Sequence, residues 1–146
     1  MPDAGQLAID DAGLIAAARE AMERAYSPYS GYRVGAALLT AGGSVVSGCN
    51  VENVSYGLTM CAERVAVGRA VALGHTKYRA IAIVTDGSAA VSPCGGCRQV
   101  LAEFAPDLKV VSQGLEERHV WSLTELLPEP FEAPPAWRGR KDEEGT

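Results

Sequence analysis

Two short segments of the chain contain residues whose types and spacing suit metal chemistry. Residues 59–64 read TMCAER and residues 92–99 read SPCGGCRQ. Cys94 and Cys97 are three residues apart, which brings both sulfurs to one side of a first helical turn. Cys61 supplies a third thiolate, and three protein ligands plus a water are typical of a catalytic zinc, whereas a structural zinc site normally has a fourth protein ligand. The spacing predicts a zinc held by Cys61, Cys94 and Cys97.

Glu63 and Arg64 follow the first of these cysteines directly. In the middle of a helix, Cys61 and Glu63 would point in nearly opposite directions. At a helix end, a metal beyond the terminus is within reach of Cys61 while Glu63 reaches the water bound to it, so we expect Glu63 to carry the protons of a hydrolysis. Three thiolates around Zn²⁺ leave a charge of about -1, which Arg64 is expected to compensate. The alternative for Arg64 is a solvated helix arginine.

A CxxC pair alone has other interpretations, namely a structural zinc site or a redox dithiol. The preceding CAE, about thirty residues before the CxxC and with a predicted strand between, favours the catalytic site. The fourth cysteine, Cys49, stands in a predicted strand. We expect it to be a buried structural thiol, and it is also a conceivable fourth ligand.

Hydrophobic periodicity and turn residues predict the elements that must position these side chains. We expect helices over residues 10–26, 59–73 and 92–104, strands over 33–40, 44–50, 79–85, 108–111 and 118–121, and a closing helical turn over 122–127. The third of these helices should have Ser92 as its N-cap and Pro93 at its first position. This order predicts an α/β fold, a mixed sheet with helices on both faces.

The bulk composition restricts the class of protein. With 146 residues, 47% of them hydrophobic, the chain is expected to form one domain over residues 1–131, followed by a mobile tail over 132–146 that is rich in Pro, Gly and charge. The net charge of -5 argues against a nucleic-acid partner. No signal peptide or membrane-spanning run is visible, so we expect a cytoplasmic protein with no membrane contact.

Five segments of the chain resemble a known family: AYSPYSGYRVGAAL, GCNVENVSYG, MCAER, PCGGCRQVLAEF and LLPEPF. From about residue 10 to residue 131 the chain is similar to the small homotetrameric cytidine deaminases. The resemblance implies a three-layer α/β/α fold with a mixed five-stranded sheet and one zinc per subunit. It further implies hydrolytic deamination of cytidine and 2′-deoxycytidine to uridine and 2′-deoxyuridine plus ammonia, as in pyrimidine salvage, by a homotetramer whose active sites are completed across subunits.

The resemblance also implies roles on the sugar side of the site. It assigns Asn50 and Glu52 to the ribose hydroxyls, and the backbone carbonyl of Ala62 to the exocyclic amine of the base. From the residues alone, an Asx turn and a surface acid are the alternative for the polar pair. A pair that binds substrate hydroxyls would select nucleosides over free bases.

Three aromatic residues complete the implied site. Tyr32 stands where the family commonly has a phenylalanine against the pyrimidine ring. Phe131 matches an aromatic residue that reaches a neighbouring subunit's site, and Tyr56 lies in a segment with similar contacts across subunits. Simple packing is the alternative for Tyr56 and Phe131, and Glu129 and Pro130 stand where the family usually has small residues.

Three rival functions remain open at this point. A deaminase of blasticidin-type nucleoside antibiotics shares the zinc motifs, although NVENVSYG and the arginine of CAER favour cytidine. A deaminase of bases within nucleic acid needs a basic groove and usually a histidine in place of the first cysteine. A noncatalytic zinc-binding module would need no acid and a closed coordination sphere, which makes Glu63 the discriminating residue.

Overall fold

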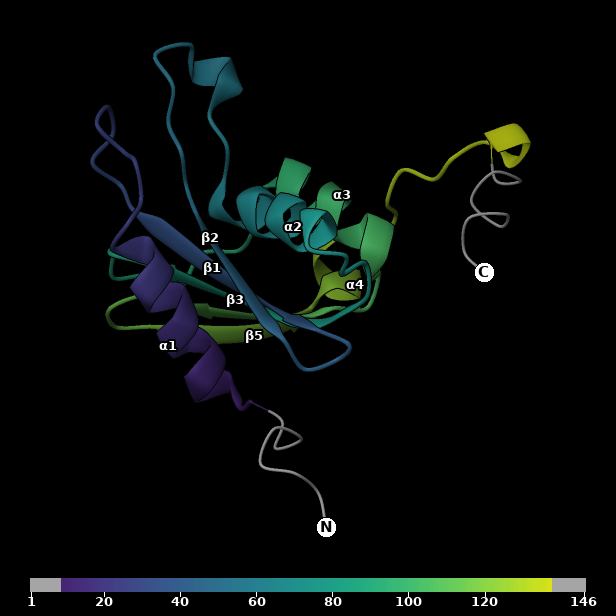
Figure 1. Cartoon of the computed structure of the whole chain (residues 1–146), viewed down its shortest axis with the longest axis horizontal. Helices are drawn as coiled ribbons and strands as arrows, with labels where there is room; N and C mark the ends of the chain where they lie inside the picture. The colour runs from purple at the N-terminus through teal and green to yellow at the C-terminus, as the bar shows by residue number, and fades with distance from the viewer. Residues whose placement is uncertain (1–8, 138–146) are drawn as a thin grey trace.

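A computed structural model describes residues 9–137 of the chain as one mixed five-stranded sheet covered by helices (Figure 1). The elements in chain order are α1 (Asp11–Met22), β1 (Val34–Thr40), β2 (Val45–Cys49), the short 3-10 helix η2 (Tyr56–Leu58), α2 (Ala62–Ala72), β3 (Tyr78–Thr85), α3 (Gly95–Phe104), β4 (Lys109–Gln113), β5 (Arg118–Ser122) and α4 (Leu123–Leu126). The strand order is β2-β1-β3-β4-β5. The β3–β4 pair is parallel and the other three pairs are antiparallel. The predicted α/β fold is confirmed.

The two faces of the sheet bury separate hydrophobic clusters, because successive side chains of a strand point to opposite faces. On β3, Ile81 and Ile83 pack with α2 and α3, while Ala82 and Val84 pack under α1. Both faces of this central strand are therefore covered, as its continuous apolar sequence predicted. Figure 1 shows α1 on one side of the sheet and α2 and α3 on the other, which gives three layers. No helix in the described part of the chain is long and apolar enough to cross a membrane.

Two predicted helices have different ends in the structure, because backbone pairing competes with the helix. The first helix was predicted to reach Tyr26, but α1 ends at Met22 since the Tyr26 amide donates to the Asn50 carbonyl. The second was predicted from Thr59, but Met60 pairs with Val51 as an antiparallel bridge. This bridge keeps the chain extended until Cys61, so α2 begins at Ala62.

The third helix also begins later than predicted. Ser92 does not cap it, because its hydroxyl accepts a hydrogen bond from Arg98 Nη2. Pro93 precedes the helix, and its carbonyl accepts from Arg98 Nε. Cys94 is the N-cap residue of α3, with an extended backbone, so the helix starts at Gly95. The shift places a metal-ligand candidate at the helix terminus itself.

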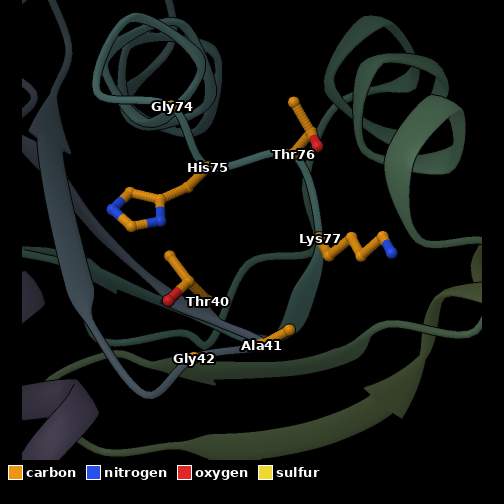
Figure 2. A pocket seen from close by; sticks show the side chains of 7 residues that line it. All are labelled: Thr40, Ala41, Gly42, Gly74, His75, Thr76 and Lys77. Atoms are coloured by element: carbon orange, nitrogen blue, oxygen red, sulfur yellow. The ribbon is translucent and has the colours of Figure 1, made fainter. Parts of the chain in front are cut away.

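The end of the sheet away from these helix starts holds a small open pocket of about 190 Å³, at the end of β1 and the turn that follows α2 (Figure 2). It is lined by Thr40, Ala41, Gly42, Gly74, His75, Thr76 and Lys77. Figure 2 shows the Lys77 side chain extending away from it. No cysteine or carboxylate lines this pocket, whereas the three cysteines of the predicted metal site lie at the starts of α2 and α3.

The predicted tail falls largely outside the described residues, which end at Trp137. Its mobility and the domain boundary after Phe131 stay predictions.

Candidate active site

Three cysteines from two helix starts meet at one point above the sheet. Cys61 is the N-cap residue of α2, Cys94 is the N-cap residue of α3, and Cys97 lies in the first turn of α3. Their sulfur atoms all lie within 4.8 Å of one another. The prediction that these cysteines converge is confirmed.

The donor set and its spacing fit zinc. Two thiolates at about 2.3 Å from one tetrahedral zinc are roughly 3.8 Å apart, and the sulfurs of Cys61 and Cys94 are 3.8 Å apart. Thiolate ligands also favour zinc over divalent metals such as magnesium and calcium, which prefer oxygen ligands. Cys49 is not part of the group that converges. It lies half-buried on β2, so the alternative in which Cys49 is a fourth ligand is wrong.

The electrostatics of the cluster favour the ionisation of Cys61 and oppose that of Cys97. A hydrogen bond with Cys97 and a contact with Arg64 lower the pKa of Cys61 to about 5. The same hydrogen bond with Cys61, together with burial, raises the pKa of Cys97. Arg64 Nη2 donates to Cys61 Sγ at 3.5 Å, and the negative sulfur in turn raises the pKa of the guanidinium. All three cysteines can be deprotonated together only if a cation compensates their charge. A metal ion that binds deprotonated cysteines supplies that charge.

Glu63 lies in the first turn of α2, beside the cysteines, and its residue is 5% exposed. Burial raises the pKa of its carboxyl group, and the negative charge of Cys61 raises it further. A carboxyl group whose pKa moves toward neutrality both accepts and releases protons under working conditions. The expected helix-end geometry is present, since α2 begins one residue before Glu63.

Asn50 and Glu52 lie at the end of β2, where the chain leaves the sheet. Asn50 is buried, and its Oδ1 accepts from the Val34 amide at 2.9 Å while its Nδ2 donates to the Tyr32 carbonyl at 2.8 Å. Glu52 Oε1 accepts from the Tyr29 and Ser30 amides, and its Oε2 accepts from the Ser30 hydroxyl. These bonds within the chain were not predicted from the sequence. They leave each side chain part of its hydrogen-bonding capacity, since Asn50 has a second N–H and Glu52 has further lone pairs.

Tyr32 and Ala62 stand in different surroundings, the first near the surface and the second in the core. Tyr32 is half-exposed, and a Cβ placed on Gly87 would be 3.6 Å from its Cε2 atom, so the loop after β3 lies against the ring. Ala62 is fully buried at the start of α2. Its carbonyl oxygen lies against Gly48, where an added Cβ would be 2.8 Å away.

Tyr56 and Phe131 lie on the surface of the chain. Their residues are 75% and 72% exposed. Tyr56 belongs to an arm that projects from the same end of the sheet as the loop after α1 (Figure 1), and its ring centroid is 6.0 Å from that of Tyr29. The Phe131 amide donates to Gln99 Oε1, and Gln99 Nε2 donates to the Phe131 carbonyl. Gln99 is thus a tether that the sequence analysis missed, although it stands within the second cysteine motif.

Comparison with known proteins places the chain. A family profile described as "Cytidine and deoxycytidylate deaminase zinc-binding region" matches residues 9–113. The chain belongs to this family. Relatives agree with the match: a cytidine deaminase from Halalkalibacterium halodurans is 50% identical over 122 residues, which are 82% of this chain and 92% of that protein. The family is zinc-binding, and the three cysteines above are the metal-ligand candidates that the structure brings together.

A solved structure and a second relative show how similar the chain is to two kinds of deaminase. The crystal structure of a cytidine deaminase from Burkholderia pseudomallei superposes with a TM-score of 0.81 at 46% identity, covering 84% of this chain and all of that one. A blasticidin-S deaminase from Bacillus cereus is 33% identical over 105 residues, covering 66% of this chain and 75% of that protein. The chain is therefore a hydrolytic deaminase, and it is more identical to the two cytidine deaminases named above than to this blasticidin-S deaminase.

Proposed function

We propose that the protein catalyses the hydrolytic deamination of cytidine and 2′-deoxycytidine to uridine and 2′-deoxyuridine plus ammonia. The observation that carries this proposal is the buried Glu63 beside three converging cysteines. Identity of 50% to a cytidine deaminase, against 33% to a blasticidin-S deaminase, supports the choice of substrate. None of the four cysteines is in a disulfide bond, which suits a reducing cytoplasm.

The residues of the chain divide the chemistry among them. Cys61, Cys94 and Cys97 hold the zinc, which when bound supplies a Lewis-acid centre that makes water acidic enough to react near neutral pH. Glu63 takes a proton from the attacking water and delivers it to the ring nitrogen beside the amine-bearing carbon. The same carboxyl group then accepts the proton of the hydroxyl group added to that carbon and passes it to the exocyclic amine, so that the C–N bond breaks, ammonia leaves and the carbonyl of the uridine product forms. Arg64 keeps Cys61 anionic through its 3.5 Å contact.

The substrate-binding residues surround this centre. In our proposal Asn50 and Glu52 bind the ribose hydroxyls with the hydrogen-bonding capacity that their bonds within the chain leave over. Tyr32 stacks on the pyrimidine ring, and its hydroxyl makes that edge more polar than a phenylalanine would. The Ala62 carbonyl accepts from the exocyclic amine.

The variant Glu63→Gln tests the mechanism. It removes the proton carrier at nearly constant volume, so turnover of cytidine to uridine should fall by at least about a hundredfold. Zinc content should stay at about one per chain in both proteins. Glu20→Gln makes the same change on the exposed face of α1 and serves as the control. Undiminished turnover in Glu63→Gln would refute the assigned role, and faster turnover of blasticidin S than of cytidine would refute the substrate.

We further propose a homotetramer in which Phe131, and with it Tyr56, completes the site of a neighbouring subunit. Both rings are exposed in the single chain, and the backbone of Phe131 is held at both its N–H and its C=O by Gln99. Exposed aromatic side chains on anchored backbone are suited to burial against a partner.

Complementation between subunits tests this arrangement. Glu63→Gln subunits retain Phe131 but lack the proton carrier, whereas Phe131→Ala subunits retain Glu63. If the ring acts across the interface, mixed oligomers should recover activity that neither variant has alone. Mixtures that show only the sum of the two separate activities would place Phe131 in its own subunit's site or in packing.

A further inference from the structure

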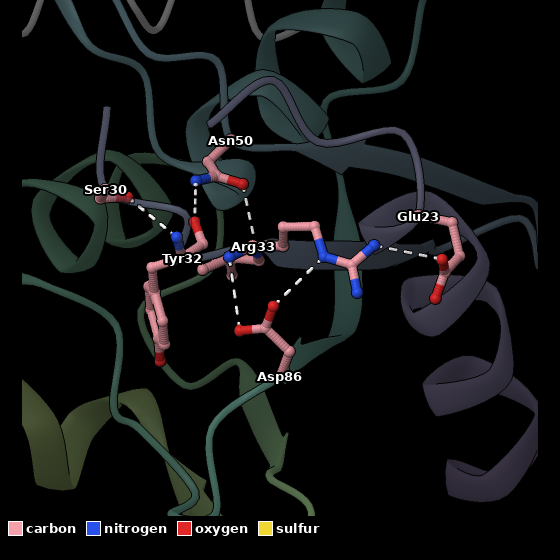
Figure 3. Close-up of polar contacts among 7 residues, drawn as sticks. Glu23, Ser30, Tyr32, Arg33, Asn50 and Asp86 are labelled. Atoms are coloured by element: carbon pink, nitrogen blue, oxygen red, sulfur yellow. Dashed lines mark hydrogen bonds and ion pairs between the residues drawn. The ribbon is translucent and has the colours of Figure 1, made fainter. Parts of the chain in front are cut away.

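The backbone of Tyr32 and that of the next residue, Arg33, are held by side chains from three separate parts of the chain (Figure 3). The Tyr32 amide donates to Ser30 Oγ at 3.0 Å, and the Tyr32 carbonyl accepts from Asn50 Nδ2 at 2.8 Å. The next residue, Arg33, is bound to Asp86, where the chain leaves β3. The position of the Tyr32 ring therefore depends on contacts with residues far from it in sequence.

Asp86 links this segment to the end of β3, a strand at the centre of the sheet. Its Oδ1 accepts from the Arg33 amide at 3.4 Å and its Oδ2 accepts from Arg33 Nε at 3.2 Å, so one carboxylate binds both the backbone and the side chain of Arg33. Such a two-point contact sets an orientation as well as a distance. Gly87, the following residue, is the one that lies against the Tyr32 ring.

The other ion pair of Arg33 has a different character. Arg33 Nη1 lies 3.2 Å from Glu23 Oε2, but the Glu23 side chain is 62% exposed and contacts no backbone of the Tyr32 segment through this bond. An exposed pair of this kind contributes little, because solvent screens it. The two acidic partners of one arginine thus provide an internal comparison.

We propose that Asp86 is a positioning residue for the nucleoside base: through Arg33 it orients Tyr32 against the loop that begins at Gly87. This inference rests on the proposed function of Tyr32 in stacking on a pyrimidine nucleoside. Asp86 itself touches neither the cysteine cluster nor Glu63 in the bonds described above. Its removal should weaken nucleoside binding and leave the chemical step nearly unchanged.

The test compares steady-state kinetics on cytidine for the full-length zinc-loaded enzyme and its variants. Asp86→Ala should raise KM about tenfold while kcat changes by less than about twofold, the signature of lost uniform binding. The inhibition constant of uridine should rise by the same factor. Arg33→Ala, which keeps the backbone N–H that donates to Asp86, should have a smaller effect, and Asp86→Asn should restore part of the loss because it keeps an acceptor.

Controls separate positioning from folding and from the proposed function. Glu23→Gln should leave KM unchanged, and Asp86→Ala should retain its zinc. In a Tyr32→Ala background, Asp86→Ala should add little, because the ring on which it acts is gone. An unchanged KM in Asp86→Ala, an equal rise in Glu23→Gln, or full additivity with Tyr32→Ala would overturn the inference. If Asp86→Ala does not fold, Asp86→Asn and Arg33→Ala carry the same comparison. A wild-type enzyme that does not turn over cytidine would instead overturn the proposed function.

Discussion

Gly48 on β2 packs closely against the first turns of α2, so an added methyl group at this position should change both stability and activity. A Cβ at this position would lie 2.5 Å from the Ala66 nitrogen and 2.8 Å from the Ala62 carbonyl oxygen. Both are backbone atoms, so relief requires α2 to move by about 1 Å to restore ordinary contact distances. Ala62 lies between Cys61 and Glu63, so the movement displaces a proposed metal ligand and the proposed proton carrier together.

The expected magnitudes follow from this clash. Overpacking of a core typically costs about 1–3 kcal/mol, which for a chain of this size lowers Tm by roughly 3–10 °C. A misplacement of about 1 Å at a catalytic group costs up to about a hundredfold in rate. Gly48→Ala should therefore lose both stability and kcat, measured by thermal unfolding and by uridine formation.

Gly68 provides the matched control, because it lies exposed in α2 with no atom within 4 Å of an added Cβ. Gly68→Ala should raise stability by about 0.5–1 kcal/mol, since alanine is the better helix former, and should leave kcat unchanged. The same substitution in two places is thus expected to have opposite signs. A Gly48→Ala enzyme with wild-type Tm and kcat would refute the close packing of α2 on β2.

Three further outcomes test the site. Cys97→Ser should reduce zinc well below one per chain by elemental analysis, whereas Cys49→Ser should keep it, and equal zinc in both would contradict the ligand assignment. Gln99→Ala removes two hydrogen bonds of about 1 kcal/mol each from the Phe131 backbone, so KM for cytidine should rise by up to about thirtyfold, and it should not rise further in a Phe131→Ala background. The Ser30 hydroxyl and two backbone amides lower the pKa of Glu52. The bonds to its carboxylate are therefore fully present at any pH above the ordinary pKa of a carboxyl group, and they are lost only as the pH falls through the lowered pKa. Ser30→Ala should move that loss to higher pH in an NMR titration of the carboxyl carbon, and an unmoved titration would contradict the bond.

Much of the fold could be predicted from the sequence because its signals are local. Apolar residues at both parities of 79–85 indicated a central strand, and Asp10 marked the start of α1, where its side chain accepts from the Gly13 amide. The ends of helices were harder to predict. Met60 and Tyr26 have no feature that marks them as bridge partners of Val51, because that pairing depends on how the arm folds back.

The metal chemistry could be predicted from residue types and spacing alone, because CAE and PCxxC at a helix start leave few alternatives. The contacts that support the proposed substrate-binding residues could not be predicted in this way, because they depend on the tertiary structure. Asp86 and Arg33 are 53 positions apart, and Gln99 and Phe131 are 32 apart, so no periodicity or short motif connects them. Hydrogen bonds between such distant residues exist only after the sheet has set its strand order and register, which bring the end of β3 beside the start of β1.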